Sequence, residues 1–171
     1  MGILENGSGR LPEVTQTPAW YALRVVNNHD KQVVKALCMK GLEAFSPQRF
    51  VRRQWVDRVR TIQMPIFPGY VFCRFSAREQ VLVLRTSGLL PIKSHELGLI
   101  VVPETEVAEL QKLAQARVDA QPIDYVESGN LKVIQTGPLS GLQLFVREHN
   151  GATEFVKSFH SFRQSCLIIS S

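Results

Sequence analysis

The final part of the chain has the pattern that most restricts the possible folds. From residue 129 to residue 171, short runs of β-branched and aromatic residues alternate with turn signals, among them Gly137-Pro138 and Asn150-Gly151. The expected strands span residues 131–135, 143–147, 153–159 and 165–170. Several short strands in so short a segment are typical of a small all-β barrel. Glycine costs about 1 kcal/mol and proline about 3 kcal/mol inside a helix, so the pattern favours this barrel over a helical arrangement.

The preceding region mixes helical and extended patterns. Strands are expected at residues 20–26, 44–51, 56–62 and 69–75, helices at 30–40, 76–88 and from Pro103 onward, with 89–102 extended. This order predicts an α+β fold in which helices pack on an antiparallel sheet as an α/β sandwich, with the β-barrel following it. The expected organisation is a disordered tail at 1–18, a first domain at 19–117, a linker at 118–128 and the barrel at 129–171.

Charge is distributed unevenly along the chain. The net charge of +5 divides into −1 for residues 1–18, +8 for 19–102 and −2 for 103–171. A basic first domain followed by a slightly acidic barrel indicates two functional regions, of which the first faces an anion such as nucleic acid. The expected nucleic-acid-binding residues are Lys31, Lys35, Arg49, Arg52, Arg53, Arg58, Arg60 and Arg85. The alternative is that some of these side chains only form a solvated surface.

Strand parity separates two faces of the first sheet, because successive side chains point to opposite sides. One set is uniformly apolar and should lie beneath helices: Tyr21, Leu23, Val25, Val71, Cys73 and Phe75. The other set holds Trp20, Ala22, Tyr70 and Phe72, with Phe67 nearby. An aromatic sheet face of this kind is a candidate binding pocket. The alternative is that the third helix covers this face completely.

Sequence motifs for catalysis, metals and cofactors are missing. The chain has no glycine-rich phosphate loop and no His-x-x-x-His pair, and its four histidines are scattered. Cys38, Cys73 and Cys166 match no zinc spacing and leave one thiol over from any disulfide, which predicts three buried thiols in a reducing cytoplasm. We therefore expect a protein that is not an enzyme, without a catalytic site, metal site or cofactor, and without a membrane-spanning helix.

Two motifs resemble those of a known family. Ile66-Phe67-Pro68-Gly69-Tyr70-Val71-Phe72, taken with the leading Trp20-Tyr21, resembles the NusG family of transcription elongation factors, and residues 129–142 resemble the family's KOW motif. The resemblance extends over residues 19–171 and implies an NGN-like domain followed by a KOW (SH3-like) barrel. Trp55-Val56-Asp57-Arg58 is closer to the specialised RfaH-like and UpxY-type antiterminators.

The resemblance also implies a function and partners. NusG-like proteins grip the clamp helices of the largest RNA polymerase subunit, lie beside DNA in the elongation complex and suppress pausing or termination. Trp20, Ala22, Phe67, Tyr70 and Phe72 would then bind polymerase, and the barrel would contact a small-subunit ribosomal protein or Rho. The alternative function is an RNA- or ribosome-binding module with no polymerase role.

The sequence departs from the family pattern in each domain, and the family offers two states for the barrel. Arg24 stands on the aromatic face where an apolar group is expected, and Leu144 replaces the usual KOW glycine, which puts the barrel's usual partner in doubt. Some RfaH-like proteins hold the second domain as a helical hairpin over the polymerase pocket. Here we expect a barrel that folds on its own and leaves the pocket open.

Overall fold

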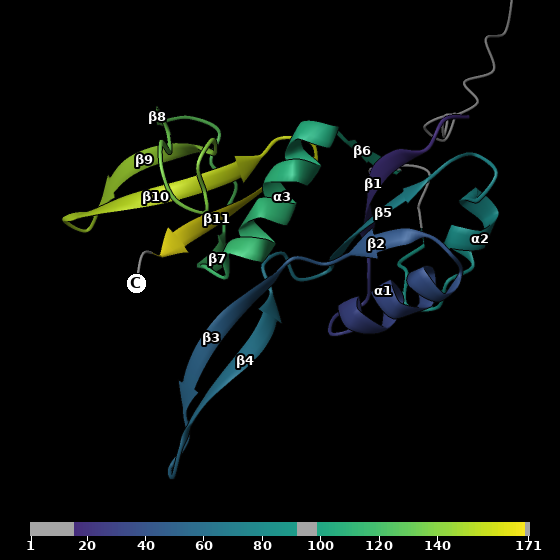
Figure 1. Ribbon diagram of the computed structural model, residues 1–171, viewed down its shortest axis with the longest axis horizontal. Coiled ribbons are helices and arrows are strands. Elements are labelled where there is room, and N and C mark those ends of the chain that lie inside the picture. The colour runs from purple at the N-terminus through teal and green to yellow at the C-terminus, as the bar shows by residue number, and fades with distance from the viewer. Residues whose placement is uncertain (1–15, 92–98, 170–171) are drawn as a thin grey trace, which may run out of the picture.

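The computed structural model describes residues 16–91 and 99–169, so almost all of the expected tail lies outside the described residues. The chain forms two lobes with helix α3 (Glu104–Ala116) beside the second, and a long hairpin projects from the junction between them (Figure 1). The elements of the first lobe are β1 (Ala19–Arg24), α1 (Asp30–Met39), β2 (Glu43–Phe45), β5 (Tyr70–Phe75), α2 (Gln80–Leu84) and β6 (Ile100–Val102). Its strands form an antiparallel sheet in the order β2-β5-β1-β6.

The helix-covered face of this sheet is the one that strand parity predicts. Tyr21, Leu23 and Val71 are buried, and they belong to one apolar cluster with Val33 of α1 and Val83 of α2. Apolar burial of this extent is the main force that holds the two helices on the sheet. Helix α2 is shorter than expected, since it ends at Leu84 and a turn follows up to Gly88. Gly88 has φ of +95° and lies against His29 and Val33, where a side chain would clash.

The projecting hairpin consists of β3 (Gln48–Gln54) and β4 (Val59–Pro65). The two strands pair over their full length, with Gln48 opposite Pro65 and Gln54 opposite Val59. They form a separate two-stranded sheet, so most of the hairpin extends beyond both lobes (Figure 1). The expected strand at 44–51 is thus divided between β2 and β3, and the expected strand at 56–62 corresponds to β4.

The second lobe is the all-β unit. Its elements are β7 (Asp119–Ile123), β8 (Asn130–Val133), β9 (Gln143–His149), β10 (Ala152–Phe159) and β11 (Gln164–Ile169). They form an antiparallel sheet in the order β7-β11-β10-β9-β8. The α+β fold with a C-terminal β region is therefore confirmed, and the described residues 119–169 are not a helical hairpin.

Residues expected to belong to a linker contribute the first strand of this unit. Asp119 to Ile123 pair with β11, and Ala120 is fully buried. The pairing is compatible with Pro122 because β7 lies at the end of the strand order, where a missing N–H costs little. Asp, Gln and Pro do not favour a strand, so the local sequence does not predict β7. The segment becomes a strand because it pairs with β11.

The cysteines do not all occupy the expected environment. Cys73 and Cys166 are buried, and burial raises the pKa of each thiol to about 12. Cys38 is exposed on α1, so the expectation of three buried thiols is wrong for this residue. All three thiols are free. Within the described residues, none of the helices has the length and apolar character that crossing a membrane requires.

Candidate functional site

The aromatic face predicted by strand parity forms one contiguous group of side chains. Trp20 and Ala22 of β1 lie beside Phe72 of β5, with Ala22 directly opposite Phe72. Phe45 of β2 extends the group: its ring centroid lies 5.4 Å from Trp20 and 5.5 Å from Phe72. We define the aromatic face as Trp20, Ala22, Phe45, Phe67, Tyr70 and Phe72. Phe45 is the member that sequence reasoning missed, although its place in a predicted strand was available as a signal.

Arg24, the unusual residue on this face, lies over an aromatic ring. Its guanidinium carbon is 5.6 Å from the ring centroid of Tyr70, its partner across the β1–β5 pair. A guanidinium above an aromatic ring is attracted by the electron-rich ring face. The arginine therefore covers the edge of the face with its charge toward solvent, as its exposed position allows.

The aromatic face is not an open pocket. Phe67 is only 1% exposed, and Trp20, Ala22 and Phe72 are also buried. Phe162, from the turn between β10 and β11, places its ring centroid 5.4 Å from Phe67, 5.6 Å from Tyr70 and 5.1 Å from Phe72. The expectation of a barrel that leaves the pocket open is therefore wrong for this structure, because side chains of the second lobe occupy the place of a ligand.

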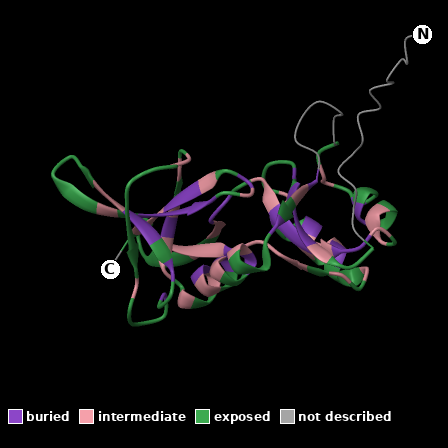
Figure 2. Cartoon of the chain, turned by 90° about the horizontal axis from the view of Figure 1, so that it is seen from above, coloured by how far each residue is buried: buried purple, intermediate pink, exposed green. Residues whose placement is uncertain are grey.

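The two lobes share one apolar core across this contact. Phe159 packs against both Phe67 and Phe162, at centroid distances of 5.5 Å in each case. The same buried cluster contains the apolar stripe of α3, which consists of Val107, Leu110 and Leu113. Because Phe159 and Phe162 of the second lobe also contact the aromatic face, the third helix covers only part of it. Burial continues from one lobe into the other in Figure 2. Leu144, the residue that departs from the KOW pattern, is 3% exposed and belongs to this cluster.

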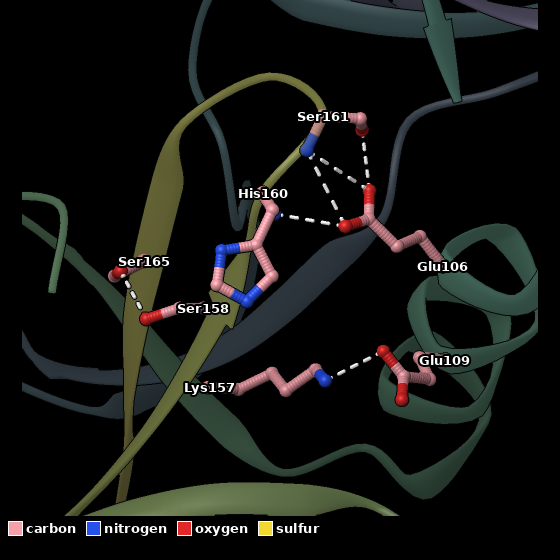
Figure 3. Close-up of polar contacts among 7 residues, drawn as sticks. All are labelled: Glu106, Glu109, Lys157, Ser158, His160, Ser161 and Ser165. Atoms are coloured by element: carbon pink, nitrogen blue, oxygen red, sulfur yellow. Dashed lines mark hydrogen bonds and ion pairs between the residues drawn. The ribbon is translucent and has the colours of Figure 1, made fainter. Parts of the chain in front are cut away.

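Helix α3 also makes polar contacts with the turn that carries Phe162 (Figure 3). The Glu106 carboxylate accepts hydrogen bonds from the N–H of His160 at 2.8 Å, from the N–H of Ser161 and from the Ser161 hydroxyl. Hydrogen bonds to an ionised acceptor are stronger than neutral ones. Glu106 therefore fixes the turn, and with it the position of the Phe162 ring.

Further polar contacts join α3 and the base of the hairpin to the second lobe. The Lys157 ammonium lies 2.5 Å from the Glu109 carboxylate, and its side chain is only 7% exposed (Figure 3). Lys112 donates a hydrogen bond to the Ser140 carbonyl at 2.7 Å. Arg49 at the base of the hairpin pairs with Asp119 of β7 at 3.1 Å. These charges hold the second lobe in a defined orientation, because a partly buried charge without its partner is costly.

Replacing Glu106 with alanine should loosen the contact between the lobes. The change removes hydrogen bonds from two backbone N–H groups and one hydroxyl to a charged acceptor, and one such bond typically contributes about 1.5–3 kcal/mol. Cys166 reports opening, because it lies buried in the shared core and its raised pKa suppresses the reactive thiolate. We expect its labelling by a thiol reagent at pH 8 to become roughly tenfold faster in Glu106→Ala.

The matched control for this experiment is Glu104→Ala, which removes an exposed carboxylate from the same first turn of α3. Cys73 supplies an internal reference, because it lies in the other core, beneath α1 and α2. Equal acceleration at Cys73 and Cys166 would indicate global unfolding in place of lobe separation. Unchanged labelling of Cys166 in Glu106→Ala would show that Glu106 does not secure the docked state.

The predicted nucleic-acid-binding residues lie in three separate places. Arg52, Arg53, Arg58 and Arg60 are exposed toward the end of the hairpin, whereas Arg49 at its base is engaged with Asp119. Lys31 and Lys35 are exposed on α1, and Arg85 is exposed at the end of α2. The structure therefore places five of the eight charges on the hairpin, of which four are exposed and Arg49 is paired with Asp119 in the docked state.

The described residues contain no group of three histidine, cysteine, aspartate or glutamate side chains placed to hold a metal ion. The features that stand out are an apolar aromatic face, covered from within the chain, and a projecting basic hairpin. Both are suited to binding macromolecules.

A family model and a solved structure both match the chain. The family model described as "Transcription termination factor nusG" matches residues 18–111, which is more than half of the chain. Among solved structures, the chain is similar to NusG from Thermotoga maritima, described as "Domain interaction in Thermotoga maritima NusG", with a TM-score of 0.50 and 18% identity. That match covers 90% of this chain and 93% of the other, and at this identity it supports the fold alone. No curated protein matches the chain.

Proposed function

Because the chain belongs to the NusG family of transcription factors, we propose that it is an elongation and antitermination factor that binds the RNA polymerase clamp helices through its aromatic face. In this role it suppresses pausing or termination and carries out no catalysis. The observation that carries the proposal is the aromatic face itself, since five side chains of the sheet together with Phe67 supply the apolar anchors that dominate protein interfaces. The proposed place of action is the cytoplasm.

Because the second lobe covers the aromatic face, the proposed function requires two conformations of the chain, one docked and one separated. The docked state buries Phe67 and Phe72 against Phe159 and Phe162, so polymerase cannot reach the same surfaces. A separated state presents the aromatic face to polymerase and frees the barrel for a second partner, for which Rho and a small-subunit ribosomal protein are the candidates. A ligand that binds only the separated state shifts the equilibrium toward it. The resemblance to specialised antiterminators stays a prediction.

Isolated polymerase elongation complexes provide the test of the proposed function. We expect them to retain the full-length chain, and the amount retained should fall as salt rises, because hairpin arginines lie on the DNA backbone in the complex. Each neutralised phosphate contributes about 0.7–0.9 log units of affinity per tenfold change in salt. The double variant Arg52→Glu/Arg53→Glu should therefore bind more weakly at low salt and show a shallower salt dependence.

The matched control is the double variant Lys31→Glu/Lys35→Glu, which reverses two exposed charges on α1 and leaves the hairpin intact. Retention by ribosomal subunits with none by elongation complexes would overturn the polymerase proposal in favour of a ribosome-binding module. A salt response that Arg52→Glu/Arg53→Glu does not alter would remove the hairpin from the DNA contact.

A further inference from the structure

The outer end of the β3–β4 hairpin exposes a tryptophan. Trp55 is the first residue of the turn that joins the strands, and its backbone N–H donates a hydrogen bond to the Arg58 carbonyl at 2.8 Å. Its side chain is 58% exposed, whereas Trp20, the other tryptophan, is 5% exposed. Val56 and Val59 beside it are exposed as well. We define the hairpin tip as residues 52–60.

The tip is also strongly cationic. Arg52, Arg53, Arg58 and Arg60 are all exposed, and the only carboxylate in the segment is Asp57. Asp57 lies 4.0 Å from Arg58 with both side chains more than half exposed, so it neutralises little. Arg53 and Arg60 stand directly opposite each other in the strand register, an arrangement of like charges that destabilises a hairpin. An anionic partner relieves this repulsion, which makes the tip complementary to an anion.

The combination of an exposed indole with surrounding guanidinium groups selects among anionic partners. A duplex offers phosphates to the arginines but keeps its bases stacked inside. A single strand offers phosphates together with unpaired bases, and such bases stack on aromatic side chains. Arginines that track the backbone and an aromatic ring that receives a base are the two components of single-strand binding sites.

We propose that the hairpin tip binds single-stranded DNA, with an unpaired base stacked on the Trp55 indole and the neighbouring phosphates held by Arg53, Arg58 and Arg60. This inference rests on the proposed function, which places the hairpin beside DNA in the elongation complex. It goes beyond that function by assigning a base-stacking residue and by stating which form of DNA the hairpin prefers. The tip lies outside the contact between the lobes, so the full-length chain binds in its docked state (Figure 1).

Intrinsic fluorescence of the full-length chain measures this binding directly. Titration with a single-stranded DNA oligonucleotide at low salt should quench Trp55, while the buried Trp20 contributes a constant background. Trp55→Ala should weaken binding of a labelled oligonucleotide by roughly 5- to 100-fold, because one stacked base is lost. Trp55→Phe retains a ring and should bind within a fewfold of the original chain, although its quenching signal disappears.

Met39→Ala is the matched control, since it removes another exposed apolar side chain from a region away from the hairpin. Unchanged affinity of Trp55→Ala for single-stranded DNA would overturn the proposal. Equal quenching and equal affinity with duplex DNA would overturn it, as would binding to single-stranded RNA with none to DNA. Retention of an acidic protein at the tip with no oligonucleotide binding would assign the surface to a protein partner and refute the stacking site.

Failure of this inference can be distinguished from failure of the proposed function. Binding of the same variants to core polymerase without nucleic acid depends on the aromatic face and not on the hairpin tip. Polymerase binding that persists in Trp55→Ala, with no DNA affinity in the unmodified chain, rejects the stacking site alone. Trp55-dependent DNA binding without polymerase binding rejects the proposed function alone.

Discussion

A shortened chain of residues 1–118 should bind RNA polymerase about 10- to 1000-fold more tightly than the full-length chain. Removal of β7 to β11 takes away Phe159 and Phe162, the rings that cover Phe67 in the docked state. The affinity measured for a two-state protein is reduced by the fraction that is competent to bind, and a minor state commonly makes up about 0.1–10% of the population. Titration of fluorescently labelled protein with core polymerase gives both dissociation constants.

Phe162→Ala in the full-length chain provides the matching control, because it weakens docking and keeps the barrel present. It should shift the affinity in the same direction as the truncation and by a smaller factor, since Phe159 and the contacts of Glu106 and Glu109 remain. Circular dichroism should show that residues 1–118 keep the signal of α1 and α3. Equal affinities for the folded short chain and the full-length chain would mean that docking does not compete with polymerase.

The second large effect is expected for Phe67→Ala in the shortened chain, which should weaken polymerase binding by about 30-fold or more. Truncation of a buried aromatic anchor at an interface typically costs over about 2 kcal/mol. The shortened chain is the appropriate background because Phe67 in the full-length protein contacts the second lobe in the docked state and is proposed to contact polymerase in the separated state. There the substitution both opens the docked state and removes an anchor, and the two effects oppose each other.

Comparison of alanine substitutions at Phe67 and at Phe162 separates an effect on polymerase binding from an effect on docking. Phe67 and Phe162 touch each other, at a centroid distance of 5.4 Å, so alanine at either position weakens docking. Only Phe67 belongs to the surface that polymerase is proposed to bind. We therefore expect Phe162→Ala to raise affinity in the full-length chain and Phe67→Ala to lower it in the shortened one. Unaltered binding by a folded Phe67→Ala chain would exclude Phe67 from the polymerase surface.

The structure also changes the stability expected for Phe67→Ala. Phe67 is part of the core shared by both lobes, and replacement of a buried phenylalanine by alanine commonly costs about 3–5 kcal/mol. The sequence predicts this residue beside a candidate binding pocket, whereas the structure places it in the core shared by both lobes. In the full-length chain, thermal unfolding of Phe67→Ala has to be measured before its binding is interpreted.

Local patterns were sufficient to predict most of the elements, although not β7, and the two faces of the first sheet. Alternation along β1 and β5 assigns Tyr21 and Val71 to one face and Trp20 and Phe72 to the other, because side-chain direction in a strand depends only on residue parity. The same holds for the β form of the second lobe, where glycines and prolines at turns make long helices unfavourable. These properties depend on neighbours within a few residues along the chain.

Only the tertiary structure decided what lies on the aromatic face. Exposed aromatic residues on a sheet are equally compatible with a free pocket and with one filled by another part of the chain. Phe162 and Phe67 differ by 95 in residue number, and Glu106 and Ser161 differ by 55. No local pattern contains either contact, because hydrophobic attraction is non-directional and any apolar surface of matching shape satisfies it. The sequence by itself therefore determined which side of the sheet carries most of the aromatic face, and the packing of the two lobes decided that this face is covered.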